Sequence, residues 1–158
     1  MNPTNQSTIF LPVVGTTFFR LVLNTARRFA YPFAPVLSRG LGVSLSAITS
    51  LIAINQVTSL LGALIGPMSD RLGYRKMMIA GMAMLATGML AAAIFPIYAV
   101  VLVALFLAGL GKSIFDPALQ AWVGSRVPYR RRALVMGIME TSWSASTLIG
   151  IPLVAILM

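Results

Sequence analysis

Five long apolar runs follow one another along the chain, and short polar breaks separate them. A helix that crosses a bilayer needs about 20 mainly apolar residues, and all five runs reach that length. The pattern therefore predicts an all-α integral membrane protein with five transmembrane helices. Their expected limits are 13–37, 43–66, 77–95, 97–122 and 133–157.

The breaks between the runs contain the residues typical of turns. Gly42 follows the first run, and Phe95 and Pro96 follow the third. The other two breaks are charged, at 70–76 and 124–132. Glycine, proline and clustered polar residues are the strongest local signals for loops, so the breaks support the five predicted spans.

Composition removes the main alternative, a soluble helical bundle. Hydrophobic residues make up 58% of the 158 residues and charged residues only 9%, and the mean hydropathy is +0.91. Soluble domains carry about 25% charged residues. We therefore expect a chain surrounded by the lipid bilayer.

The net charge of +9 comes from 12 basic and 3 acidic residues. In a soluble protein this excess of basic residues would indicate that the protein binds nucleic acid. Here most basic residues lie in short loops between apolar runs, which membrane topology explains, so no nucleic-acid partner is expected.

The chain has no cysteine and no histidine. A disulfide, a thiolate or histidine metal site and a histidine-based catalytic triad are therefore excluded. No nucleophile stands beside a base in the sequence, so we expect neither an enzyme nor a cofactor.

Basic residues in short loops mark the cytoplasmic side of a membrane protein. One set of loops carries seven of them and the other set carries only Arg39. The seven are Arg71, Arg75, Lys76, Arg126, Arg130, Arg131 and Arg132. This asymmetry predicts a cytoplasmic N-terminus, with residues 1–12 as a short tail and 13–158 as the helical bundle. No basic residue precedes Arg20, so a cleavable signal peptide is not expected.

Six ionisable residues fall within the predicted spans. Each costs about 2.5–3.5 kcal/mol at the membrane centre, or on the order of 15–20 kcal/mol together, if it faces lipid. They are tolerable only where they face one another or a polar cavity, which indicates a protein that moves a polar solute. The six are Arg20, Arg27, Arg28, Lys112, Asp116 and Glu140.

Five of the polar residues in the first run recur with helical spacing, so they share one face of the helix. They are Thr17, Arg20, Asn24, Arg27 and Tyr31, with Arg28 at the edge of the face. A cavity lining and a structural network between helices both explain this stripe. For Arg20 a third interpretation is a side chain that extends to the cytoplasmic interface.

Lys112 and Asp116 are four residues apart and are expected to pair on one helix face. Pro117 follows directly, and we expect it to break the helix there. Glu140 lies at a comparable depth in the fifth run, together with Trp143. Protonation would neutralise either carboxylate and release a basic partner, so both are candidate proton carriers; a permanent ion pair that fixes helix packing is the alternative. The surplus of basic residues among the six is a weak indication of an anionic substrate.

The segment 66–76 resembles the signature of the major facilitator superfamily. The signature residues are Gly66, Asp70, Arg71, Gly73, Arg75 and Lys76, in the loop after the second span. Pro128 with Arg132, and the stretch 41–44, resemble further turns of the same family. The match covers the first five spans of the six-helix N-terminal half.

This resemblance implies two six-helix bundles that rock about a central site by alternating access. It implies that Asp70 contacts a helix of a C-terminal half and that Arg71, Arg75 and Lys76 form its charge network. Gly66 and Gly73 would permit close helix approach and a tight turn. Residues 124 and 125 lack the acidic residue often found before the family's second loop, and Gly150 and Pro152 only approximate its drug-antiporter pattern.

We therefore expect a secondary transporter of a small organic solute in a bacterial inner (plasma) membrane, with proton-coupled efflux by an antiporter as the working hypothesis. The abrupt end at Met158 suggests a fragment that lacks the C-terminal six-helix half or a partner chain. A small accessory membrane protein without transport activity, and a homodimeric transporter, are the alternatives. The expected cavity is lined by Arg20, Asn24, Arg27, Tyr31, Lys112, Asp116, Glu140 and Trp143.

Overall fold

A computed structural model describes residues 4–157, and the side chains of residues 11–58, 60–61 and 71–157. All secondary structure in this part of the chain is helical. The helices are α1 (Thr4–Arg28), α2 (Ala34–Leu41), α3 (Leu45–Leu72), α4 (Tyr74–Ile94), α5 (Tyr98–Arg126), α6 (Tyr129–Ala145), a π-helical turn (Ser146–Gly150) and α7 (Ile151–Leu157). The last three follow one another without interruption.

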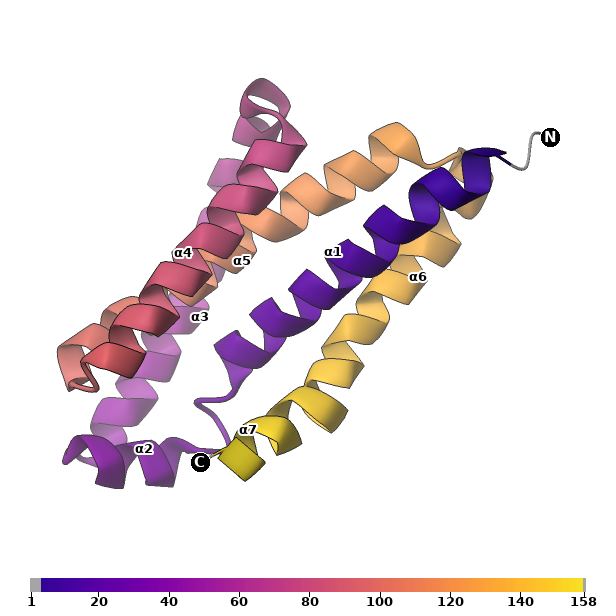
Figure 1. The fold of residues 1–158 in the computed structure, drawn as a ribbon. Coiled ribbons are helices and arrows are strands. Elements are labelled where there is room, and N and C mark those ends of the chain that lie inside the picture. The colour runs from indigo at the N-terminus through magenta and orange to yellow at the C-terminus, as the bar shows by residue number, and fades with distance from the viewer. Residues whose placement is uncertain (1–3, 158) are drawn as a thin grey trace.

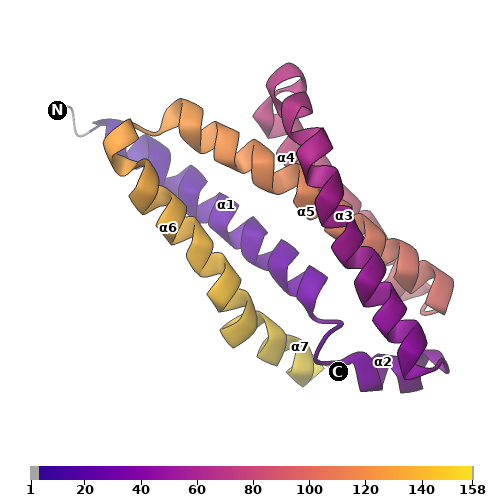
Figure 2. The same cartoon turned by 180° about the vertical axis from the view of Figure 1, so that it is seen from behind.

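The helix α5 occupies the middle of the bundle. It packs most extensively against α4 and α3 on one side, and it also contacts α1 and α6. Figures 1 and 2 show α1 and α6 side by side, with α3 and α4 across the bundle from them. Because four helices cover α5, polar residues on it are placed in the interior.

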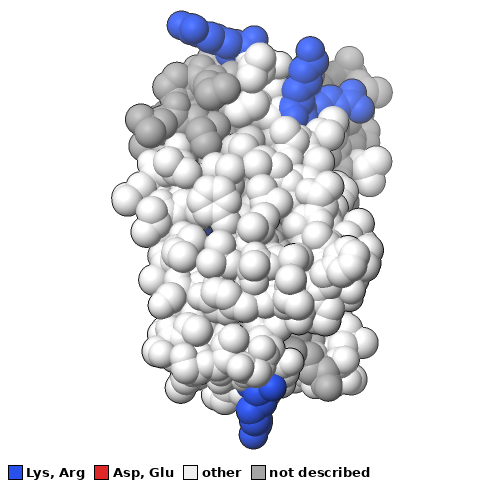
Figure 3. Space-filling view, turned by 90° about the vertical axis from the view of Figure 1, so that its left-hand side faces the viewer, with Lys and Arg blue, Asp and Glu red and all other residues white. Residues whose placement is uncertain are grey.

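The outside of the bundle is apolar. Many large hydrophobic side chains are exposed, among them Leu60, Ile94, Val103 and Leu148. Figure 3 shows basic side chains at the two ends of one face, with an almost wholly uncharged surface between them. This distribution suits a helix bundle surrounded by lipid.

Three helices in the described residues are long and apolar enough to cross a membrane: 74–94, 98–126 and 129–157. A fourth candidate is the bent pair formed by α2 and the first part of α3, whose axes differ by 117°. The prediction of an all-helical membrane fold is confirmed, whereas five spans and a cytoplasmic N-terminus stay predictions. The N-terminal end of α1, the α3–α4 turn and the α5–α6 connection do lie at the same end of the bundle (Figures 1 and 2).

The first predicted span, 13–37, is not one continuous helix. The helix α1 begins at Thr4, inside the segment assigned to a tail, and it ends at Arg28. Residues 29–33 form turns before α2 begins. Pro32 explains the break, because proline has no N–H to donate and disfavours a helical residue before it.

Pro117 has no such effect. We expected it to break the fourth span, but α5 continues through it to Arg126. The irregularity lies instead in the π-helical turn, where a Cβ on Gly150 would collide with the side chain of Thr25. Tight packing of α5 by four helices keeps it helical at the proline.

The turn between α3 and α4 consists of a single residue, Gly73, with φ of 89°. Left-handed backbone of this kind favours glycine. The expectation that Gly73 permits a tight turn is therefore confirmed.

Candidate functional site

Four charged side chains from three helices form one cluster in the interior. Arg20 of α1 bridges two carboxylates: its Nε lies 3.1 Å from Oδ1 of Asp116, and its Nη1 lies 2.8 Å from Oε1 of Glu140. The Nζ of Lys112 lies 2.5 Å from Oδ2 of Asp116. Two cations and two anions thus compensate one another, and we call these four residues the charge cluster.

Burial differs sharply within the charge cluster. Arg20 is only 7% exposed. The interpretation of Arg20 as a side chain that extends to the cytoplasmic interface is therefore wrong. The side chain of Asp116 is 21% exposed and that of Glu140 is 55% exposed. Glu140 has one ion-pair partner and Asp116 has two. Glu140 is therefore the carboxylate that the rest of the chain covers less.

A polar cavity of about 340 Å³ adjoins the charge cluster. Lys112 belongs to both, since it pairs with Asp116 and also lines the cavity. The full lining consists of Asn24, Arg27, Arg28, Tyr31, Gln56, Lys112 and Trp143. A change in the ion pairing of Lys112 therefore changes the charge that the cavity presents.

Neutral groups hold the two arginines of the cavity in place. Arg27 donates from Nε to Asn55 (3.1 Å) and from Nη2 to Gln56 (2.8 Å), both on α3. The side chain of Asn55 is itself anchored by a hydrogen bond to the backbone oxygen of Leu105.

Arg28 points to the other side, toward the helix formed by α6, the π-helical turn and α7. Its Nη1 donates to Oγ1 of Thr147 (2.9 Å), and its guanidinium lies 4.3 Å from the centre of the Trp143 ring. An arginine over an aromatic face is held by a cation–π interaction. Consecutive arginines near the end of α1 thus reach two different walls of the cavity.

The structure brings together all eight residues expected to line a cavity, in two groups. Asn24, Arg27, Tyr31, Lys112 and Trp143 line it, whereas Arg20, Asp116 and Glu140 complete the charge cluster beside it. Thr17 of the polar stripe takes no part, because its hydroxyl donates to the backbone of Val13.

The sequence-based site missed two contributors, Asn55 and Gln56. Two adjacent amide side chains inside the second apolar run were a usable signal, because buried amides need hydrogen-bond partners. Arg28 was placed only at the edge of the polar stripe, although it lines the cavity.

The surroundings of Gly66 and the side chain of Asp70 lie outside what the structure describes. Of the other signature residues, Arg71, Arg75 and Lys76 are exposed around the Gly73 turn. Their role as a conformational latch stays a prediction.

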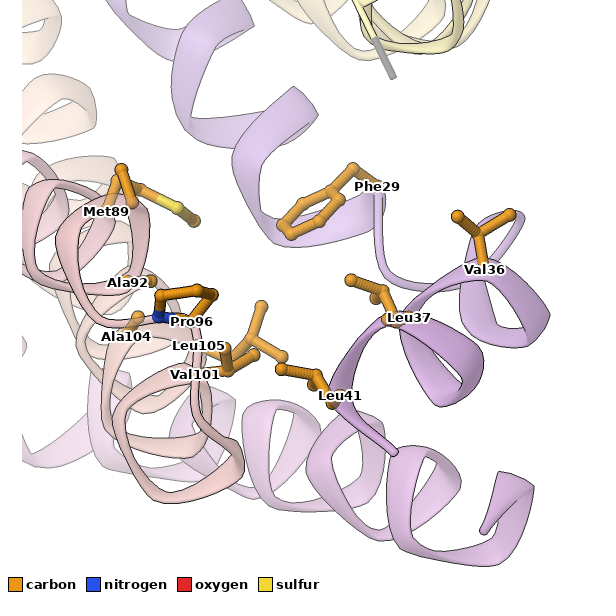
Figure 4. Close-up of a pocket in the computed structure, with 12 residues that line it drawn as sticks. Phe29, Val36, Leu37, Leu41, Met89, Ala92, Pro96, Val101, Ala104 and Leu105 are labelled. Carbon is orange, nitrogen blue, oxygen red and sulfur yellow. The ribbon is translucent and has the colours of Figure 1, made fainter. Parts of the chain in front are cut away.

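A second cavity, of about 380 Å³, is chemically different. It is lined by apolar side chains from the turn that follows α1 and from α2, α4 and α5, among them Phe29, Leu37, Met89 and Val101. Figure 4 shows these side chains around a common space, with no ionisable group among those drawn. It therefore offers nothing to recognise a charged solute.

An apolar exterior, basic ends and a charge cluster built around a buried arginine beside a polar cavity define a multi-pass membrane protein. The comparisons with known proteins then give its family. The chain belongs to the Major Facilitator Superfamily, whose family model matches residues 16–158.

The chain is similar to the uncharacterized MFS-type transporter YwfA of Bacillus subtilis (strain 168). It is 31% identical over 123 residues, which are 77% of this chain and 30% of the relative. The chain thus matches less than a third of that relative's length. No solved structure matches the chain.

Proposed function

We propose that this chain forms part of a proton-coupled secondary transporter that moves a small polar solute through the Arg27–Arg28–Lys112 cavity by alternating access. The observation that carries the proposal is Arg20, which joins the more exposed carboxylate, Glu140, to Asp116, which pairs with a cavity residue. Family membership supports transport as the general activity.

The charge cluster suggests how a proton acts on the cavity. Protonation of Glu140 removes one of the two charges that Arg20 bridges. Arg20 then interacts with Asp116 alone and attracts it more strongly. Because Arg20 and Lys112 compete for the same carboxylate, Asp116 then binds Lys112 less strongly. Neutralisation at the exposed carboxylate is thereby transmitted to a residue of the solute site.

Asp70, Arg71, Arg75 and Lys76 are proposed to form the latch of the outward-facing state, in which Asp70 meets a helix from a C-terminal half. We place the α3–α4 turn on the cytoplasmic side of a bacterial plasma membrane, because seven basic residues share that side with the N-terminus. Efflux by exchange for protons remains a prediction.

Transport is tested in cells that express the chain, supplied in turn with small organic acids, amines and sugars. We expect the cellular level of at least one solute to differ from that in cells with an empty vector. An uncoupler should abolish the difference, and so should Glu140→Gln at equal membrane abundance.

The matched control is Arg126→Gln, which also removes one charge but lies exposed at the end of α5. It should transport like the unchanged chain. A solute gradient that survives the uncoupler would reject proton coupling. If no solute moves, the chain does not transport alone, as expected of the accessory-protein alternative.

A further inference from the structure

The charged side chains of the interior do not balance. Four cations, Arg20, Arg27, Arg28 and Lys112, face two carboxylates, Asp116 and Glu140. The chain has three acidic residues in all, and the third, Asp70, belongs to the last turn of α3 beside Gly73. The interior therefore carries two surplus positive charges whatever the pairing among these residues.

This surplus is concentrated at the cavity. Three of its seven lining residues are cationic, and none of the seven is acidic. Both interior carboxylates lie behind it in the charge cluster, where Arg20 and Lys112 engage them. A solute in the cavity thus meets guanidinium, ammonium and amide donors, together with the ring of Trp143.

We propose that the cavity is a binding site for a small organic anion and that the anion binds together with a proton. The anion site stands without the proposed transport function, and only the coupling of anion binding to transport rests on that function. Charge-assisted hydrogen bonds from arginine and lysine are the strong ones for carboxylate and phosphate groups. The volume of about 340 Å³ lies within the range of small-molecule sites, which is about 300–1,000 Å³.

The sign of the coupling follows from the groups around the charge cluster. Arg20 reaches it from α1, Glu140 from α6, and Lys112 and Asp116 from α5. The described charged residues of α3 and α4 are Arg71, Arg75 and Lys76, all exposed near the Gly73 turn. Arg27, Arg28 and Tyr31 face the same cavity as Lys112.

A proton on Glu140 makes this environment more positive and loosens Lys112 from Asp116, so the protonated protein binds an anion more tightly. By reciprocity, the bound anion favours protonation to the same extent. Co-transport requires this mutual strengthening of proton binding and anion binding. The exchange expected from the sequence requires the opposite, because in exchange the solute and the proton compete.

The test uses three probes of nearly equal shape and different charge: benzoate, benzamide and benzamidine. Binding to the purified full chain in lipid nanodiscs is measured by calorimetry, with empty nanodiscs as the blank. We expect benzoate to bind and the neutral and cationic probes to bind at least roughly tenfold more weakly. Equal binding of the three, or binding of none by the folded chain, overturns the anion site.

Arg28→Gln separates the site from general charge effects. Arg28 contacts the neutral side chains of Thr147 and Trp143, so the substitution takes no partner from a carboxylate. We expect it to weaken benzoate binding roughly tenfold, whereas Arg126→Gln, with the same change in net charge, leaves it unchanged. Equal effects of the two variants would contradict a local site.

Coupling is read from the affinity for benzenesulfonate, an anion that keeps its charge throughout the acidic range in which a glutamate takes up a proton. We expect affinity to fall as the pH rises, and Glu140→Gln to show high affinity without pH dependence. Affinity that rises with pH overturns the co-binding of proton and anion. Binding can be measured without transport, so the two proposals can fail separately. A chain that binds benzoate but moves no solute supports the anion site and rejects the proposed transport function. A chain that transports only amines supports transport and rejects the anion site.

Discussion

At the scale of single residues, Arg20 has the largest structural role in the charge cluster. It is buried on α1 and bridges carboxylates that lie on α5 and α6. A buried charge that loses its partner is strongly destabilising. Arg20 therefore links three helices through electrostatics, in addition to its proposed part in coupling.

Replacement of Arg20 by methionine should lower the free energy of unfolding by on the order of 3 kcal/mol, because Asp116 keeps only Lys112 and Glu140 keeps no ion-pair partner among the described residues. Thermal unfolding in detergent measures the loss. A second change, Glu140→Gln, should recover part of it. A double variant that loses the sum of both single effects would show that Arg20 and Glu140 do not interact.

Part of this cluster could be predicted from the sequence. The spacing of Lys112 and Asp116 on one helix predicted their pairing, and the Nζ–Oδ2 distance of 2.5 Å confirms it. The partners of Arg20 could not be predicted, because helical periodicity gives the face that a residue occupies but not the helix opposite that face. Cross-helix neighbours depend on packing.

At the scale of helices, two prolines have different consequences. Pro32 lies in the turn of residues 29–33, after α1 has ended at Arg28. Pro117 lies in α5, which packs against α1, α3, α4 and α6, and the helix continues. The sequence-based prediction carried the first span through Pro32 and expected the break at Pro117, whereas the structure has the opposite arrangement.

Close approach of α4 and α5 depends on two glycines that face one another. A Cβ on Gly81 would lie 2.5 Å from the backbone oxygen of Gly111, a distance that real Cβ atoms essentially never show. Gly81→Ala should therefore force the helices apart and destabilise the fold by about 1–3 kcal/mol. Thermal unfolding in detergent measures the change.

The control for this prediction is Gly137→Ala on α6, where a Cβ would meet nothing within 4 Å. Alanine is favoured over glycine in a helix by about 1 kcal/mol, so this variant should be as stable as the unchanged chain or more so. A Gly81→Ala variant of undiminished stability would contradict the close packing of α4 on α5.

At the scale of the whole molecule, the membrane class and the family could both be predicted from sequence. Long apolar runs and the signature around Gly73 suffice for that, and the match to residues 16–158 confirms the family. The path of the chain between α1 and α3 could not be predicted, because the short helix α2 and the 117° bend after it depend on Pro32 and on the Gly42 cap.

The sidedness of the bundle can be tested without background, because the chain has no cysteine. Arg130→Cys and Phe95→Cys each place one exposed thiol near an opposite end of the bundle. In intact cells, a membrane-impermeant maleimide should label the Phe95 variant and spare the Arg130 variant. Labelling of the Arg130 variant alone would reverse the predicted topology, and labelling of both to the same extent would contradict it.

The central claim is that the charge cluster links protonation to the occupancy of the cavity. Its most direct test is proton uptake when benzenesulfonate, which stays ionised, is added to the purified chain in a weakly buffered, mildly acidic solution, followed with a pH indicator. The arrangement of Arg20, Asp116, Glu140 and Lys112 predicts uptake by the unchanged chain and none by Glu140→Gln. Benzenesulfonate binding without proton uptake, or with proton release, would contradict it.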